Sequence, residues 1–318
     1  MRLAAGTVRA GASIGVALTE PGLTAAELTR RADIAMYAAK ARGKNRVELF
    51  TPDRHGAVAR HRLLEDQLPH ALERGEIHVL YQPYRDLATG EWAGVEALVQ
   101  WQHPTQGAVN CRELLQLAER TGDIGAVTTS FLRTVAAETA AMPGGDRLRL
   151  GINLSAHQLF DPRFADALLQ TLAECRLAPS RMTLEIVESE QIDDPRARAR
   201  LERLAACGVR IALDNFGTGY VSLASLRAFP IHQLKIDGSF LAGDPGTLDL
   251  VLSVGALLGT DTVVQGVETQ GQLDRLRATR AGAAQGPFVA PIMRAEQLKG
   301  LLAGGQRSQN AELNSGPG

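Results

Sequence analysis

The sequence lacks the features that mark secreted or membrane-embedded proteins. Its three cysteines, Cys111, Cys175 and Cys207, are far apart and form no CxxC pair. This spacing is typical of reduced thiols, so neither disulfide bonds nor a zinc site are expected. The longest apolar run, at 248–258, is too short to cross a bilayer, and the first residues lack the apolar core of a secretion signal. These absences predict a cytoplasmic protein with no membrane segment in this chain.

An excess of charge of either sign is also absent. The chain has 34 basic and 35 acidic residues and a net charge of −1. A near-neutral chain has no electrostatic reason to bind DNA or RNA, so no nucleic-acid polymer is expected as a partner. Its 318 residues are 45% hydrophobic, which is the composition of a globular protein with one large domain or two.

Most of the chain alternates between apolar, β-branched-rich runs and helical patterns. The first two runs are separated by the short turn ATGE, which predicts an antiparallel hairpin. The predicted strands lie at or near 77–86, 92–101, 148–153, 182–187, 209–213, 233–236, 261–265 and 281–286. Helical patterns separate most of the later strands. The fold class predicted is therefore α/β, a TIM-barrel-like (β/α)8 domain over residues 61–304 with one antiparallel strand.

Five polar residues stand where five of these strands should end. They are Glu96, Asn153, Glu185, Asp214 and Lys235. Side chains at the carboxyl ends of parallel barrel strands point into the mouth of the barrel, where ligands bind. Three carboxylates and an amide oxygen suit a hard divalent cation such as Mg²⁺ or Mn²⁺, and a neighbouring lysine suits a phosphate. The pattern predicts a metal site that binds a phosphorylated substrate.

Nine motifs in order carry a resemblance that covers residues 60–303. They are QP at 82–83, EAL at 96–98, WQHP at 101–104, NLS at 153–155, LEIVE at 184–188, DNFGTGY at 214–220, LKID at 234–237, GVET at 266–269 and AQG at 284–286. In these motifs the chain resembles the EAL domain family, the cyclic di-GMP phosphodiesterases. The resemblance implies hydrolysis of one phosphodiester of cyclic di-GMP to pGpG, with two metal ions flanking the attacking water.

The resemblance also implies a role for each matching residue. Glu96, Asn153, Glu185 and Asp214 match ligands of the first metal ion, and Lys235 matches the residue that orients the attacking water. The positions expected to face the substrate are Gln100, Asp237, Gln265 and Gln285. Glu188 matches a residue that braces the loop after Asp214. These roles come from the family, since spacing alone does not assign them.

Three positions depart from the family pattern. Asn215 stands where a second aspartate ligates the second metal ion, and Gln265 stands where a glutamate binds that ion and serves as general base. Gln100 replaces an arginine that contacts phosphate. Amide oxygens can bind Mg²⁺ but carry no charge, and Gln265 cannot accept a proton at neutral pH. Glu268, three residues further on, is a possible substitute base.

Three functions stay open on these residues. The first is a slow cyclic di-GMP phosphodiesterase, supported by the intact first-metal ligands and Lys235. The second is a domain that binds cyclic di-GMP without cutting it, supported by Asn215, Gln265 and Gln100. The third is a scaffold that acts only through protein contacts. The family resemblance makes a homodimer a reasonable expectation in each case.

The first fifty residues have a separate pattern of one helix between two strands. SIGVA and ADIAMYAAKARGKNRV resemble the end of a GGDEF (diguanylate cyclase) domain, whose signature and catalytic half are missing from this sequence. We therefore expect residues 1–50 to be a C-terminal GGDEF fragment without cyclase activity. Residues 51–60 are predicted to be a linker and residues 305–318 a disordered tail, because both are polar.

Overall fold

The chain folds into two compact units, residues 1–73 and residues 74–318, and each is described by itself. The computed structural model describes residues 2–3, 6–7, 11–41, 43–187, 194–219 and 223–313. Within these ranges no helix is both long and apolar enough to cross a membrane. The predicted brace Glu188 lies outside the described residues.

The N-terminal unit contains a β-α-β arrangement. Its elements are β1 (Arg2–Leu3), β2 (Gly6–Thr7), β3 (Ile14–Val16), α1 (Ala25–Ala41), β4 (Val47–Leu49) and α2 (Pro52–Glu73). Strands β3 and β4 pair in parallel, with α1 as the connection between them. Gly15 lets β3 approach α1 closely, because a Cβ at this position would lie 2.0 Å from the carbonyl oxygen of Ala32. This is the helix between two strands that the sequence predicts.

Helix α2 differs from the predicted linker. The backbone is helical from Pro52 onward, so residues 52–60 belong to the same helix as the residues that follow. Proline is well placed in the first turn of a helix, where its missing N–H group would have no intrahelical partner. The polar composition of residues 51–60 predicts a linker, but the alanines at 57 and 59 favour a helix.

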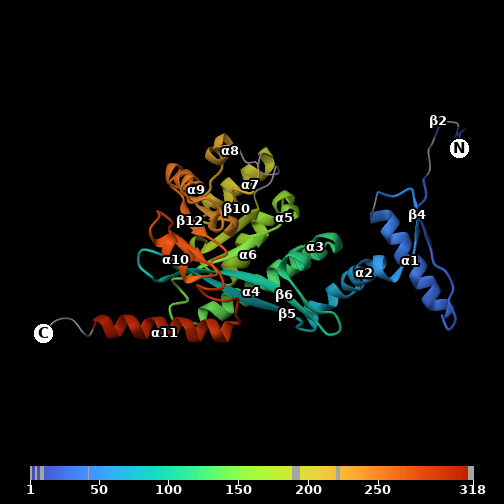
Figure 1. The fold of residues 1–318 in the computed structure, drawn as a ribbon, viewed down its shortest axis with the longest axis horizontal. Coiled ribbons are helices and arrows are strands. Elements are labelled where there is room, and N and C mark those ends of the chain that lie inside the picture. The colour runs from blue at the N-terminus through green and yellow to red at the C-terminus, as the bar shows by residue number, and fades with distance from the viewer. Residues whose placement is uncertain are drawn as a thin grey trace. The chain divides into compact units, whose positions relative to one another are not determined.

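The C-terminal unit is an eight-stranded closed barrel with helices outside it (Figure 1). The barrel strands are β5 (Ile77–Asp86), β6 (Trp92–His103), β8 (Arg149–Leu154), β9 (Met182–Val187), β10 (Arg210–Phe216), β11 (Gln233–Ile236), β12 (Asp261–Val264) and β13 (Ala283–Gln285). Strand β5 is antiparallel to both neighbours, β6 and β13, and closes the barrel. The other neighbouring pairs are parallel, and short β7 (Gly107–Val109) pairs with β6 outside the ring. The predicted barrel with one reversed strand is confirmed.

Helices and short turns connect these strands. They are α3 (Cys111–Thr121), α4 (Ile124–Ala140), α5 (Ala156–Phe160), α6 (Phe164–Glu174), η1 (Pro179–Arg181), α7 (Pro195–Ala206), α8 (Leu223–Ala228), η3 (Gly238–Leu241), α9 (Pro245–Leu258), α10 (Gln270–Arg277) and α11 (Ala295–Leu313). Local signals set several of these ends. Asn110 caps α3 by accepting a hydrogen bond from the Glu113 N–H, and Gly259 ends α9 with a φ of 67°.

Helix α11 also differs from the prediction at the C-terminus. Its backbone is helical to Leu313, through most of the segment that was expected to be a disordered tail. That segment contains glutamine, alanine, glutamate and leucine, which favour helices, beside the asparagine and serine on which the prediction depended. The helix can therefore continue from its packed first turns without a break.

Candidate active site

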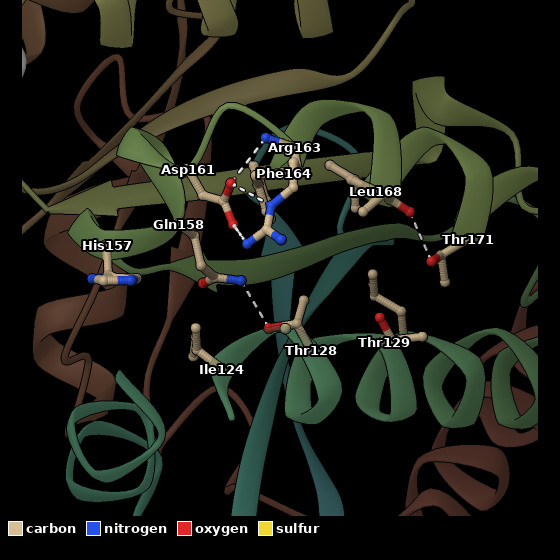
Figure 2. A pocket seen from close by; sticks show the side chains of 13 residues that line it. Ile124, Thr128, Thr129, His157, Gln158, Asp161, Arg163, Phe164, Leu168 and Thr171 are labelled. Atoms are coloured by element: carbon tan, nitrogen blue, oxygen red, sulfur yellow. Dashed lines mark hydrogen bonds and ion pairs between the residues drawn. The ribbon is translucent and has the colours of Figure 1, made fainter. Parts of the chain in front are cut away.

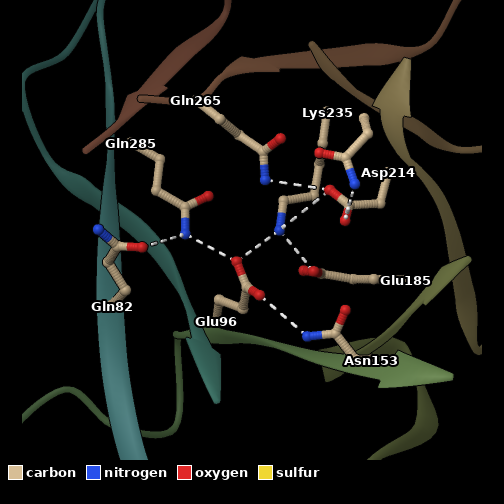
Figure 3. A network of polar contacts seen from close by, with 9 residues as sticks. Gln82, Glu96, Asn153, Glu185, Asp214, Lys235, Gln265 and Gln285 are labelled. Carbon is tan, nitrogen blue, oxygen red and sulfur yellow. Dashed lines mark hydrogen bonds and ion pairs between the residues drawn. The ribbon is translucent and has the colours of Figure 1, made fainter. Parts of the chain in front are cut away.

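Polar side chains from all eight barrel strands meet inside the barrel at one end. Each comes from a barrel strand or the residue directly after it, and together we call them the mouth network (Figure 3). Its members are Gln82, Glu96, Asn153, Glu185, Asp214, Lys235, Gln265 and Gln285. Seven of the strands run in the same direction, so their carboxyl ends open on the same side. The five residues singled out at strand ends are thus brought together.

Lys235 is the centre of this network. Its side chain is almost completely buried, and Nζ donates hydrogen bonds to Glu96 Oε2 at 2.6 Å and Glu185 Oε2 at 2.5 Å. Asp214 Oδ1 lies 3.8 Å from the same nitrogen. Burial alone would lower the pKa of Lys235, but the three carboxylates raise it above its usual range. The ammonium therefore stays protonated at neutral pH.

Glu96 is held from three sides. Oε1 accepts a hydrogen bond from Asn153 Nδ2 at 3.0 Å, and Oε2 accepts one from Gln285 Nε2 at 2.8 Å as well as the bond from Lys235. Burial pushes the pKa of Glu96 upward, but Lys235 and the two amides hold it below its usual range. Gln285 also donates to Gln82 Oε1 at 3.2 Å. Gln82 is not among the predicted site residues, although it belongs to the QP motif at 82–83.

Asp214 is bound by two of the three residues that depart from the family pattern. Gln265 Nε2 donates to Oδ1 at 3.0 Å, and Asn215 Nδ2 donates to Oδ2 at 3.1 Å. Both carboxylate oxygens are therefore bound by uncharged amide donors. Asn215 has a φ of 55°, a left-handed conformation that asparagine and aspartate tolerate better than most residues. Burial, followed by the Glu96 carboxylate, raises the pKa of Asp214.

Two glycines allow the loops that follow β11 and β12 to pack closely against each other around Gln265. A Cβ at Gly238 would lie 2.9 Å from the Gln265 carbonyl oxygen and 3.0 Å from the Gly266 Cα. Gly266 itself has a φ of 69°. The Gln265 N–H donates to the Ile236 carbonyl at 2.9 Å, which continues the pairing of β11 and β12 by one residue. This strand pairing thus holds the backbone of Gln265 in place.

Gly151 on β8 provides the space that Glu185 occupies. A Cβ at this position would lie 2.1 Å from Glu185 Oε1, which is far inside contact distance. Gly151 also pairs with Glu96 on one side and Thr183 on the other, so the strand has little freedom to move. Replacement of this glycine should therefore displace Glu185 from Lys235.

We expect Gly151→Ala to lower the free energy of unfolding by about 1–3 kcal/mol, because the extra methyl group overpacks a buried polar site. Urea denaturation measures this directly. The control is Gly300→Ala in α11, where a Cβ would meet nothing within 4 Å and a gain of up to about 1 kcal/mol is expected. Equal stabilities of the two variants would show that Gly151 is not needed for space.

The charges and donor atoms of the network fit a divalent cation. Three carboxylates face one ammonium, so the buried cluster has more negative than positive charge. Burial, followed by the neighbouring Glu96 carboxylate, raises the pKa of Glu185 to about 8. Among the described residues, Oε1 of Gln285 is buried without a hydrogen-bond partner. All donors other than Lys235 are oxygens or amides, as Mg²⁺ and Mn²⁺ prefer.

The carboxylates are nevertheless arranged around Lys235 and not around a common point between them. In the part of the chain that the structure describes, no group of three His, Cys, Asp or Glu side chains has the arrangement of a metal site. The cluster therefore has the chemistry for a cation, and Lys235 holds its carboxylates together.

Other predicted residues lie at the edge of this network. Asp237 follows β11 and caps η3, because its Oδ1 accepts a hydrogen bond from the Ser239 N–H at 2.8 Å. Gln100 is half-buried on β6, four residues beyond Glu96 and therefore on the same side of the strand. Glu268 is exposed, and its N–H donates to Gln272 Oε1 near the start of α10. None of these three side chains belongs to the mouth network.

Comparison with known proteins identifies the family. The EAL domain model matches residues 65–292, which is most of the chain. The chain therefore belongs to the EAL domain family. It is 35% identical over 93% of its length to the bifunctional diguanylate cyclase/cyclic di-GMP phosphodiesterase MucR of Pseudomonas aeruginosa, and 33% identical over 86% to the cyclic di-GMP phosphodiesterase NbdA of the same species. Relatives in this family are thus cyclic di-GMP phosphodiesterases, and such enzymes depend on divalent metal ions.

A solved structure agrees with this assignment. The structure of the MucR phosphodiesterase in complex with cyclic di-GMP has a TM-score of 0.69 and 34% identity, and covers 74% of this chain and 99% of that one. The chain spans 45% of the full MucR sequence and 36% of NbdA. What those longer proteins do as a whole therefore enters only as a proposal.

Proposed function

We propose that this domain binds cyclic di-GMP at the barrel mouth and hydrolyses it far more slowly than an EAL domain with carboxylates at positions 215 and 265. The observation that carries the proposal is the pairing of both Asp214 oxygens with the amides of Gln265 and Asn215. Support for the ligand comes from family membership and from MucR, whose structure is a complex with cyclic di-GMP.

Four residues of the network have the donors to hold one divalent ion, Mg²⁺ or Mn²⁺. They are Glu96, Asn153, Glu185 and Asp214. When bound, such an ion supplies positive charge to a phosphate and lowers the pKa of a bound water. Lys235 supports the same chemistry, because its protonated Nζ stays beside the carboxylates and offsets negative charge brought by the nucleotide. The proposed ligands of this first ion are therefore all present.

The side of the proposed site around Asn215 and Gln265 lacks negative charge and a general base. An exchange of a carboxylate for an amide at about 4 Å from a cation loses an attraction of roughly 4 kcal/mol per unit charge at an effective dielectric of about 20. Two such exchanges, at Asn215 and Gln265, weaken the hold on a second ion. Gln265 also cannot take a proton from water. Glu268 remains a predicted substitute base, but its exposed side chain is not part of the mouth network. We therefore expect the domain to keep its binding of cyclic di-GMP and to lose fast hydrolysis.

The nucleotide contacts proposed for the mouth are those of Asp237, Gln265, Gln285 and Gln100. Gln285 has a free oxygen beside Glu96, and Asp237 caps η3 at the adjacent loop. Gln100 offers hydrogen bonds but no charge to a phosphate.

We expect Gln100→Arg to tighten cyclic di-GMP binding by about tenfold, because a charge-assisted hydrogen bond to phosphate adds roughly 1.5 kcal/mol. Isothermal titration calorimetry at fixed ionic strength measures the change. Gln116→Arg, on the exposed side of α3, is the matched control for added charge. The same affinity in both variants would mean that position 100 does not face the phosphate.

Residues 1–50, within the N-terminal unit, are proposed to be the end of a GGDEF domain. Two observations support this origin. The β3-α1-β4 arrangement matches the predicted strand-helix-strand order, and an alignment with MucR over 93% of the chain must include part of this unit. Superposition of an experimental structure of residues 11–50 on a diguanylate cyclase domain would test it, and a different strand order would refute it.

A homodimer and a cytoplasmic location complete the proposal. Leu250 and Leu257, seven residues apart on α9, are 67% and 77% exposed, which gives this helix an apolar outer stripe suited to a second copy. The three cysteines are all free, as a reducing compartment allows. Sedimentation velocity showing only monomer at micromolar concentration would contradict the dimer, and recovery in an extracellular fraction would contradict the location.

A further inference from the structure

A separate cavity lies outside the barrel, between α4 on one side and α5 and α6 on the other (Figure 2). Its volume is about 340 Å³, which is within the range of small-molecule sites. Figure 2 shows Thr128 and Thr129 of α4 facing Phe164 and Leu168 of α6 across the space. No residue of the mouth network is among the described residues that line it.

Several of the polar groups in the wall already have partners within the protein. Gln158 Nε2 donates to Thr128 Oγ1 at 2.8 Å, and Gln158 Oε1 accepts from the Ser155 N–H at 3.2 Å. Thr171 Oγ1 donates to the Ala167 carbonyl at 2.8 Å. Asp161 pairs with Arg163, whose side chain is 86% exposed to solvent. A charged ligand would therefore lose its hydration without gaining a buried partner.

The same walls connect the cavity to the mouth network. Asn153 at the end of β8 is three residues before the start of α5, whose first turn is fixed by the reciprocal Ser155 and Gln158 cap. Thr128 lines this cavity and also a second space of about 10 Å³ beside Asn153 and Cys111. That second space is about the minimum size for one water molecule. It therefore leaves α4 little room to shift without moving the residues beside it.

We propose that the cavity between α4, α5 and α6 binds a small, uncharged and mainly apolar molecule, and that its occupant shifts the Asn153 end of β8. The ligand class follows from the apolar side chains in the lining and from the internal pairing of Gln158, Thr171 and Asp161; the apolar lining residues include Ile124, Leu132, Phe164 and Leu168. The coupling follows from two observations. Asn153 is only three residues from the start of α5, and Thr128 lines both the cavity and the small space beside Asn153. The site and its coupling are independent of whether the domain hydrolyses a nucleotide.

Indole is a suitable probe, because it is uncharged, mostly apolar and small enough for the cavity. We would titrate it into the full chain, labelled with ¹⁵N, and record amide spectra. Backbone signals of α4 to α6 are expected to shift saturably, and the Asn153 side-chain amide, identified by its loss in Asn153→Asp, is expected to move with the same saturation.

Two matched variants locate the binding. Gly125 and Gly271 both stand at the second helical position, in α4 and α10, and a Cβ at either would meet nothing within 4 Å. Only Gly125 lines the cavity. Gly125→Trp should weaken indole binding at least about tenfold by filling the space, whereas Gly271→Trp should leave it unchanged. Absence of saturable shifts, shifts that survive Gly125→Trp, or an unmoved Asn153 signal would each overturn the proposal.

Discussion

The double variant Asn215→Asp/Gln265→Glu is expected to hydrolyse cyclic di-GMP at least about a hundredfold faster than the parent chain. A correctly placed general base alone contributes roughly 10²–10⁴-fold. The exchange also returns two negative charges to the side of Asp214 that amides now cover. The change is conformationally mild, since aspartate tolerates the positive φ at position 215 and glutamate has the shape of glutamine.

Chromatographic measurement of pGpG in Mg²⁺ and in Mn²⁺ gives the rates. Gln116→Glu, which adds a charge on the exposed side of α3, is the control for altered net charge and should behave as the parent does. Glu96→Ala in the double variant should abolish the gained activity, because Glu96 is one of the proposed metal ligands. A double variant as slow as the parent would show that the two amides are not what limits hydrolysis.

Lys235→Met is expected to lower the free energy of unfolding by about 3–5 kcal/mol, the usual cost of leaving a buried charge without its partner. Lys235 is the ammonium that Glu96, Glu185 and Asp214 share inside the barrel. Without it the three carboxylates repel one another in a buried site. Mg²⁺ should then stabilise the variant more than it stabilises the parent, because the ion replaces the missing charge. Urea denaturation with and without Mg²⁺ measures both effects.

A second substitution separates lost charge from lost packing. Glu185→Gln in the Lys235→Met background removes one of the unbalanced carboxylates and keeps the volume of the side chain. We expect the double variant to recover part of the lost stability. If Lys235→Met costs less than about 1 kcal/mol, or if Glu185→Gln adds to the loss, Lys235 does not hold this cluster together.

The barrel and the core of the site could be predicted from the sequence. Most of the strands are apolar runs that contain β-branched residues, and the five singled-out polar residues lie in them or at their ends. Strand β6 differs from the prediction, because it continues to His103, seven residues beyond Glu96. The rule that parallel barrel strands open at one end then places Glu96, Asn153, Glu185, Asp214 and Lys235 together, and the structure confirms that placement. Their metal and substrate roles stay predictions.

The pairings within the site could not be predicted, because they depend on barrel closure. Gln82 and Gln285 are about 200 residues apart in sequence and meet only because β5 pairs with β13. The fit of Gly151 against Glu185 likewise depends on the register of two neighbouring strands. Sequence patterns show which side of a strand a residue faces, but not which atom it reaches across the barrel.

The most direct test is a calorimetric titration of the parent chain with cyclic di-GMP in Mg²⁺, followed by chromatography of the recovered nucleotide. We expect saturable binding, with cyclic di-GMP recovered intact over the time in which the Asn215→Asp/Gln265→Glu variant converts it to pGpG. Absence of binding at high nucleotide concentration, or conversion by the parent as fast as by the double variant, would contradict the proposed function.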